Sequence, residues 1–103
     1  MILFSLTVNI DNEIKDEWLE WMKQTFIPNL WLTGFFVEKR FLKLLNEEEG
    51  NGSTFSLQLT LENLEALQEF EHHHLNDYRK MLYGKYTGRL VDFYTVLEKV
   101  ELA

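Results

Sequence analysis

The sequence contains no cysteine and only one proline in 103 residues. Without cysteine the chain can form no disulfide framework, no thiolate nucleophile and no zinc site of the cysteine type. It also lacks a run of about 18 uninterrupted apolar residues, which excludes a predicted membrane helix. The opening residues, Met1 to Phe4, include no basic leader and no small-residue cleavage site, so we expect no signal peptide. These absences favour a cytoplasmic protein.

Basic residues are also scarce, because 10 Lys and Arg stand against 17 Asp and Glu, for a net charge of −7. Phosphate backbones and anionic lipid are bound through clustered Lys and Arg, and we therefore expect neither nucleic acid nor membrane as a partner. The apolar fraction of 46% and charged fraction of 26% are typical of a folded globular protein. The length predicts a single domain spanning residues 1–103.

The first third of the sequence predicts a strand and then a helix. Apolar residues alternate with mostly polar ones over residues 2–10, which is the period of a strand with one buried face. Asp11 and Asn12 follow and can accept hydrogen bonds from the free N–H groups of a helix start. Apolar residues then recur at three- and four-residue steps over residues 14–25. Pro28 is expected to end or kink this helix near Ile27, with one further turn open as an alternative.

The remaining segments predict three strands and a second helix. Residues 35–45 and 54–61 have strand character, and Asn51-Gly52 between them indicates a hairpin. A second amphipathic helix is expected from Leu64 to Leu82, capped by Thr60 or Asn63, with Asn76 as a local break. A last strand is expected over residues 89–102. The order strand, helix, strand, strand, helix, strand predicts an α+β, ferredoxin-like βαββαβ sandwich with both helices on one face of a four-stranded antiparallel sheet.

The uncovered face of such a sheet is predicted to mix polar and apolar side chains. The central strands would place on it Ser5, Thr7, Asn9, Ser56, Gln58 and Thr60. The best phase for the outer strands adds Glu38, Arg40, Leu42, Leu44, Asp92, Tyr94, Val96 and Glu98. A face of this kind is typically covered by a second copy, so we expect a homodimer with a cleft between two sheets. A monomer with a solvated face is the alternative.

Several runs resemble a family of small bacterial proteins, the DUF4286 type. They are Thr7 to Asp11, Glu17 to Met22, Ile27-Pro28 and Phe93 to Glu98. The resemblance implies a dimeric α+β barrel and carries no established activity and no agreed catalytic residues. The wider superfamily includes cofactor-free monooxygenases and haem-degrading enzymes that use an asparagine, a tryptophan and a histidine. Asn9 matches that asparagine, whereas Phe70 and Lys80 stand about where the other two would be, so we expect no cofactor.

The histidine run 72–74 is the most conspicuous motif for a metal. Consecutive helical residues point about 100° apart, so three in a row cannot share one ion. Glu69, His73 and Asp77 do have four-residue spacing, but on the expected solvent face, and we predict no metal site. His74 points towards the apolar stripe. It is either packed there or is an acid/base group at the edge of the cleft.

Six residues are predicted to contact a small-molecule ligand, namely Asn9, Arg40, Gln58, Tyr94, His74 and Trp31. An arginine holds a carboxylate through two hydrogen bonds, and Trp31 could wall the pocket mouth. The carboxylates near Arg40 could instead form ion pairs across strands. We expect a homodimeric small-molecule-binding or interaction module. The alternative is a cofactor-independent monooxygenase or isomerase that uses Asn9, Arg40, Tyr94 and His74, and no motif identifies a catalytic residue.

Overall fold

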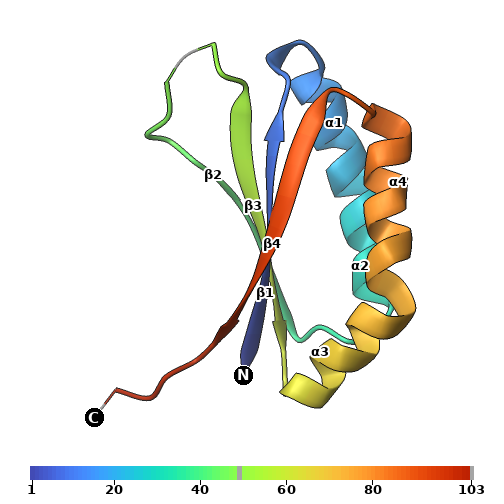
Figure 1. Cartoon of the computed structure of the whole chain (residues 1–103), viewed down its shortest axis with the longest axis vertical. Coiled ribbons are helices and arrows are strands. Elements are labelled where there is room, and N and C mark those ends of the chain that lie inside the picture. The colour runs from blue at the N-terminus through green and yellow to red at the C-terminus, as the bar shows by residue number, and fades with distance from the viewer. Residues whose placement is uncertain (49, 103) are drawn as a thin grey trace.

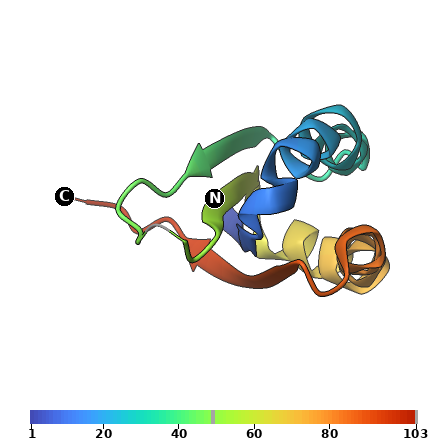
Figure 2. The same ribbon diagram turned by 90° about the horizontal axis from the view of Figure 1, so that it is seen from above.

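The computed structural model describes residues 1–48 and 50–102, which form one antiparallel sheet with all helices on one face (Figures 1 and 2). The strand order is β2-β3-β1-β4. The strands are β1 (Ile2–Ile10), β2 (Glu38–Lys43), β3 (Ser53–Leu61) and β4 (Leu90–Glu98). The helices are α1 (Lys15–Trp21), α2 (Ile27–Leu32), α3 (Leu64–Phe70) and α4 (Asn76–Tyr86). This arrangement confirms the ferredoxin-like α+β fold.

Short polar side chains fix where the helices begin. The Asp11 carboxylate accepts a hydrogen bond from the Glu13 N–H at the start of the 3₁₀ turn Asn12–Ile14, which leads into α1. The Asn63 side chain accepts from the Ala66 N–H at 2.8 Å and caps α3. Both caps satisfy donors that a helix start leaves without an internal partner.

Each helical crossover is interrupted by a π-helical stretch, which we call a wide turn. The first wide turn, Met22–Phe26, joins α1 to α2, and the second, Glu71–Leu75, joins α3 to α4 at the predicted break beside Asn76. Pro28 does not end the first helix at Ile27, since the helix continues to Leu32. The first wide turn places the proline in the opening turn of α2, where its missing N–H costs little. Among the residues that the structure describes, no helix has the length and apolar character needed to cross a bilayer.

The core lies between the sheet and the helices and is rich in aromatic rings. The even-numbered residues of β1 and the odd-numbered residues of β3 are buried along the whole strand. Trp18, Phe26 and Phe70 are the largest side chains that the helices bury against them. Phe70 packs edge-on against Phe4 and Phe36, with ring centroids 5.6 and 4.9 Å apart. The central strands therefore have the orientation that their alternation predicts.

The outer strand β4 has the opposite phase to the predicted one. Asp92, Tyr94 and Val96 lie opposite Val8, Leu6 and Phe4 of β1, so they point towards the helices. Tyr94 stacks on Phe4 at a centroid distance of 5.2 Å. The expectation that Asp92, Tyr94, Val96 and Glu98 face the uncovered side is therefore wrong. Their contacts with side chains of the helical layer and of β1, which the pattern of the strand alone does not reveal, decide the phase.

The hairpin between β2 and β3 is longer and less regular than predicted. β2 spans six residues, within the expected strand of residues 35–45. Gly50 and Gly52 adopt positive φ angles of 88° and 79°, and no non-glycine residue in the described part of the chain does. A two-residue turn at Asn51-Gly52, with both residues at positive φ, is thus not formed. A Cβ at Gly52 would lie 2.7 Å from the Asn9 Oδ1 atom, so the loop packs tightly on the end of β1.

Candidate functional site

The sheet surface away from the helices, called the open face below, combines a mostly polar centre with an apolar flank on β4 and a mixed flank on β2. The centre contains Ser5, Thr7 and Asn9 of β1 and Thr54, Ser56, Gln58 and Thr60 of β3. The flank on β4 contains Val91, Phe93 and Leu97, and the flank on β2 contains Leu42 beside the charged Glu38 and Arg40. Phe93 is 59% exposed and Val91 66% exposed. The sheet is strongly twisted, so β2 swings towards the open side at its hairpin end and β4 does so at its C-terminal end (Figures 1 and 2).

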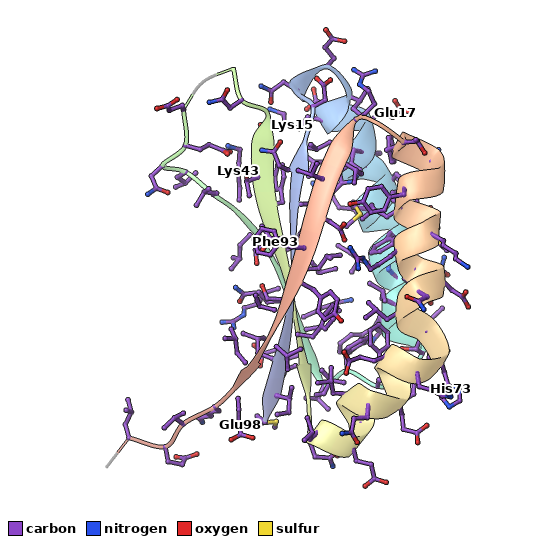
Figure 3. All side chains as sticks on the ribbon, in the orientation of Figure 1. Lys15, Glu17, Lys43, His73, Phe93 and Glu98 are labelled. Carbon is purple, nitrogen blue, oxygen red and sulfur yellow. The ribbon has the colours of Figure 1, made fainter. Side chains whose placement is uncertain are left out.

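Phe93 and Val91 are the residues of this face that the sequence interpretation missed. Phe93 projects from the middle of β4 on the side without helices (Figure 3). A large exposed aromatic ring at the centre of a strand is costly to leave in water. The signal that could have found it is the second alternating set in the strand, residues 91, 93, 95 and 97, which is as apolar as the set that is buried.

Hydroxyl and amide groups in the polar centre of the open face form hydrogen bonds with one another. The Ser5 and Ser56 hydroxyls are 3.1 Å apart, and the Gln58 amide donates to Ser56 Oγ at 3.5 Å. Arg40 lies directly opposite Gln58 on β2. Its guanidinium is 3.9 Å from the Glu38 carboxylate, a long contact between two exposed side chains. These groups leave donors and acceptors free for a polar ligand.

Asn9 lies at one end of the open face and is already held by the hairpin. Its amide donates to the Asn51 carbonyl at 3.1 Å and to Thr54 Oγ1 at 3.0 Å. The Thr54 hydroxyl in turn donates to Glu47 at 2.8 Å, and the Thr54 backbone N–H donates to the same carboxylate. These bonds, led by that of the backbone N–H, lower the pKa of the Glu47 carboxyl below its usual range. Asn9 therefore anchors the loop, on the face of the sheet opposite the helices.

The Glu47 anchor predicts a pH dependence of the hairpin. A carboxyl whose pKa is lowered on folding stabilises the fold fully above its unfolded pKa, and this stabilisation is lost as the pH falls through the lower folded pKa. We expect an NMR titration of the Glu47 carboxyl to show this lowered pKa. Thr54→Val removes the hydroxyl bond and keeps the N–H bond, so the Glu47 pKa should rise part of the way. An unchanged pKa in Thr54→Val would contradict the assigned hydroxyl contact.

Tyr94 belongs to a polar cluster on the helix side of β4. The Asp92 carboxylate, whose side chain is fully buried, accepts two hydrogen bonds from Arg79 of α4 at 3.1 and 3.0 Å and one from the Tyr83 hydroxyl. The Arg79 guanidinium lies 5.7 Å from the Tyr94 ring centroid. Hydrogen bonding to Asp92 raises the pKa of Arg79, and burial raises the pKa of Tyr83. Since Asp92 is saturated by these partners, the cluster locks α4 to β4.

His74 and Trp31 lie at two further places. His74 is half-buried, with its ring 5.4 Å from that of Phe35 and 6.1 Å from that of Phe70. Trp31 is half-buried on α2, under the Lys39 ammonium.

His73 points into solvent (Figure 3) and contacts Glu69 at 3.2 Å. Within residues 1–48 and 50–102, no three His, Cys, Asp or Glu side chains are grouped closely enough to hold a metal ion.

The structure therefore brings together three of the six predicted ligand contacts. Asn9, Arg40 and Gln58 share the open face. Tyr94 and His74 lie on the other side of the sheet, at separate positions in the helical layer. The expectation that Asp92, Tyr94 and Glu98 share a face with Arg40 and Glu38 is wrong, because the phase of β4 puts these three residues on the helix side.

Solved structures with the same fold span the whole chain. The protein At3g17210 of Arabidopsis thaliana is similar with a TM-score of 0.76 and 15% identity, over 100% of this chain and 99% of that one. An antibiotic biosynthesis monooxygenase is similar with a TM-score of 0.66 and 10% identity, over 98% and 100%. A dimeric ferredoxin-like protein from an uncultured marine organism has a TM-score of 0.65 and 7% identity, over 99% and 98%.

At these identities the structural neighbours establish the fold alone. No curated protein matches the chain in sequence. A family model does match, and it covers residues 1–100, which includes every strand and helix described above. The chain therefore belongs to the DUF4286 family, a domain of unknown function.

Proposed function

We propose that the protein is a homodimeric binding module in which two open faces meet and enclose a cleft for a small polar molecule. The observation that carries this proposal is the open face itself, where the exposed apolar side chains of β4 lie beside the polar groups of β1, β3 and β2. A second copy packed on this face would bury Phe93, Val91 and Leu97, and the polar groups would line the space between the two sheets. The dimeric ferredoxin-like protein of the same fold supports this arrangement.

The C-terminal segment also favours a partner on this side. Residues after β4 leave the body and extend past the sheet on its open side (Figures 1 and 2). Val100 and Leu102 in this segment are 76% and 92% exposed. Such apolar residues gain stability only by packing on another surface. A second copy facing the sheet would provide that surface.

The polar centre determines the chemistry of the proposed ligand. It offers serine and threonine hydroxyls, the Gln58 amide and the Arg40 guanidinium. These groups suit a small ligand with hydroxyl or carboxylate groups. An enzyme of the monooxygenase or isomerase type needs its polar groups around one cavity. Asn9, Arg40, Tyr94 and His74 do not converge, so the geometry favours binding over catalysis.

The oligomeric state tests the proposal. We expect sedimentation equilibrium at micromolar concentration to give twice the chain mass. Phe93→Asp places a charge on the apolar flank and should weaken dimerisation by at least about 100-fold, as burying an unpaired charge does. Leu32→Asp is the matched control, because Leu32 is 81% exposed on the helical side and should leave the mass unchanged. A monomeric wild-type protein would overturn both the dimer and its cleft.

The ligand is tested separately, by NMR screening of small polar fragments against the dimer. Fragments that bind in the cleft should shift the Gln58 side-chain amide and the Ser56 backbone signal. Gln58→Leu should abolish the shift of the Ser56 backbone signal without changing the sedimentation mass. Hits that perturb only residues outside the open face would contradict a cleft between the sheets.

A further inference from the structure

A second hollow lies where the first wide turn, α2 and β2 meet, and Arg40 is the one lining residue that it shares with the open face. It has a volume of about 380 Å³. Ile27, Phe41 and Leu57 form its apolar floor. The hollow, called the β2 groove below, exists because the helices lie over the central strands and leave most of the short edge strand β2 exposed.

The rim of the β2 groove is basic, in a protein with a net charge of −7. Lys23, Lys39 and Arg40 line it, which is three of the ten cationic side chains in the chain. Among the residues that the structure describes, no carboxylate lies within 4.0 Å of the Lys23 or Lys39 ammonium. Two cations without carboxylate partners thus flank an apolar surface, while the rest of the protein is acidic.

The Lys39 ammonium is already positioned by an aromatic ring. Its Nζ atom lies 4.7 Å from the centroid of the Trp31 ring, in a cation–π contact. This contact holds the charge at the groove rim and reduces the ordering that a bound anion would require. It also makes Trp31 a fluorescent reporter of any anion that approaches Lys39.

We propose that the β2 groove binds a small amphipathic carboxylate of the medium-chain fatty acid type. The hydrocarbon would lie on Ile27, Phe41 and Leu57, and the carboxylate would contact Lys23 and Lys39. A carboxylate leaves water only where cations or donors receive it, and the rim supplies them next to the apolar floor. The volume is in the range of small-molecule sites. The acidic remainder of the surface repels an anionic bilayer, which favours a free molecule over a lipid surface.

Binding of sodium decanoate to the purified protein tests the proposal. We expect saturable binding by calorimetry, accompanied by a change in tryptophan emission that Trp31→Phe removes. Lys23→Glu and Lys39→Glu should each weaken decanoate binding by at least about tenfold, because each replaces attraction by repulsion. Lys39→Arg keeps the charge and should retain most of the affinity. Lys80→Glu makes the same charge change at an exposed position of α4 and should have little effect.

Several results would overturn the groove assignment. One is equal affinity for decanol, which lacks the charge. Another is unchanged decanoate binding in both lysine variants with folding intact by circular dichroism. Binding to phosphatidylglycerol vesicles without binding to free decanoate would assign the basic rim to a membrane surface instead.

The carboxylate site in the β2 groove and the proposed dimer can be contradicted independently of each other. Lys23 and Trp31 belong to the helical layer, and the groove is formed within one protomer. Phe93→Asp should therefore keep decanoate binding while it weakens the dimer. Lys23→Glu and Lys39→Glu should keep the dimer mass while they lose the carboxylate. Loss of decanoate binding in folded Phe93→Asp would contradict a groove contained in one chain.

Discussion

Replacing Arg79 with leucine is expected to lower the free energy of unfolding by about 3 kcal/mol. The substitution leaves the Asp92 carboxylate, whose side chain is fully buried, with the Tyr83 hydroxyl as its remaining side-chain donor among the described residues. A buried charge without its cation is far costlier than a lost surface contact. The expected loss lies at the lower end of the range for buried pairs because 37% of the Arg79 side chain is exposed and its lost contacts are partly replaced by water. Urea denaturation followed by circular dichroism measures the change.

Two comparison variants show whether the buried carboxylate is the cause. Arg89→Leu removes an arginine whose partners, Asp11 and Glu13, are both solvent-accessible, so its effect should be much smaller. Adding Asp92→Asn to Arg79→Leu removes the stranded charge and should recover part of the lost stability. If Arg79→Leu and Arg89→Leu destabilise the protein equally, the Arg79–Asp92 pair is not the lock between α4 and β4.

Truncating Phe70 to alanine should destabilise the protein by roughly 3–5 kcal/mol. Phe70 is fully buried, and its ring packs against those of Phe4, Phe35 and Phe36. The cavity left behind would lie where α3 meets the sheet, among rings too rigid to collapse into it. Thermal or urea unfolding of the variant provides the measurement.

A matched truncation on the same helix isolates the cavity effect. Leu64 begins α3 and is 52% exposed, so Leu64→Ala should cost about 0.5 kcal/mol or less. Both variants add one alanine to α3, so the change in helix propensity is nearly the same in the two variants. A loss for Phe70→Ala as small as that for Leu64→Ala would show that Phe70 is not the centre of the core.

The fold was predictable because its central strands have only one apolar set each. In β1 and β3 the buried alternate residues are all apolar but one, Ser53 of β3, and their neighbours are mostly polar. Side-chain caps at Asp11 and Asn63 marked the helix starts. These signals are local, and local signals suffice to order the elements of a small α+β sandwich.

The phase of β4 was not predictable because both of its alternating sets are partly apolar. Leu90, Tyr94 and Val96 could be buried as readily as Val91, Phe93 and Leu97, and a shift of one residue exchanges the two faces. The choice is made by contacts with Arg79 of α4 and Phe4 of β1, which the pattern of the strand itself does not reveal.

For the same reason the candidate site was only partly predictable. Asn9 and Gln58, on the central strands, were placed correctly on the open face, whereas Tyr94 was not. The β2 groove depends on Lys23 and Lys39 meeting across two layers, which no spacing in the sequence reveals.

The charges on β2 limit how the sheet can grow. Four of its six residues are charged, namely Glu38, Lys39, Arg40 and Lys43, and such a strand is a poor template for another backbone. At the opposite border, β4 has two carboxylates. That of Asp92 is buried on the helix side, so it does not repel a neighbouring strand. Fibril elongation requires both borders of every molecule to accept a neighbour. With one border closed, end-to-end addition through β4 stops at a pair of molecules, which protects the protein from amyloid-like polymerisation.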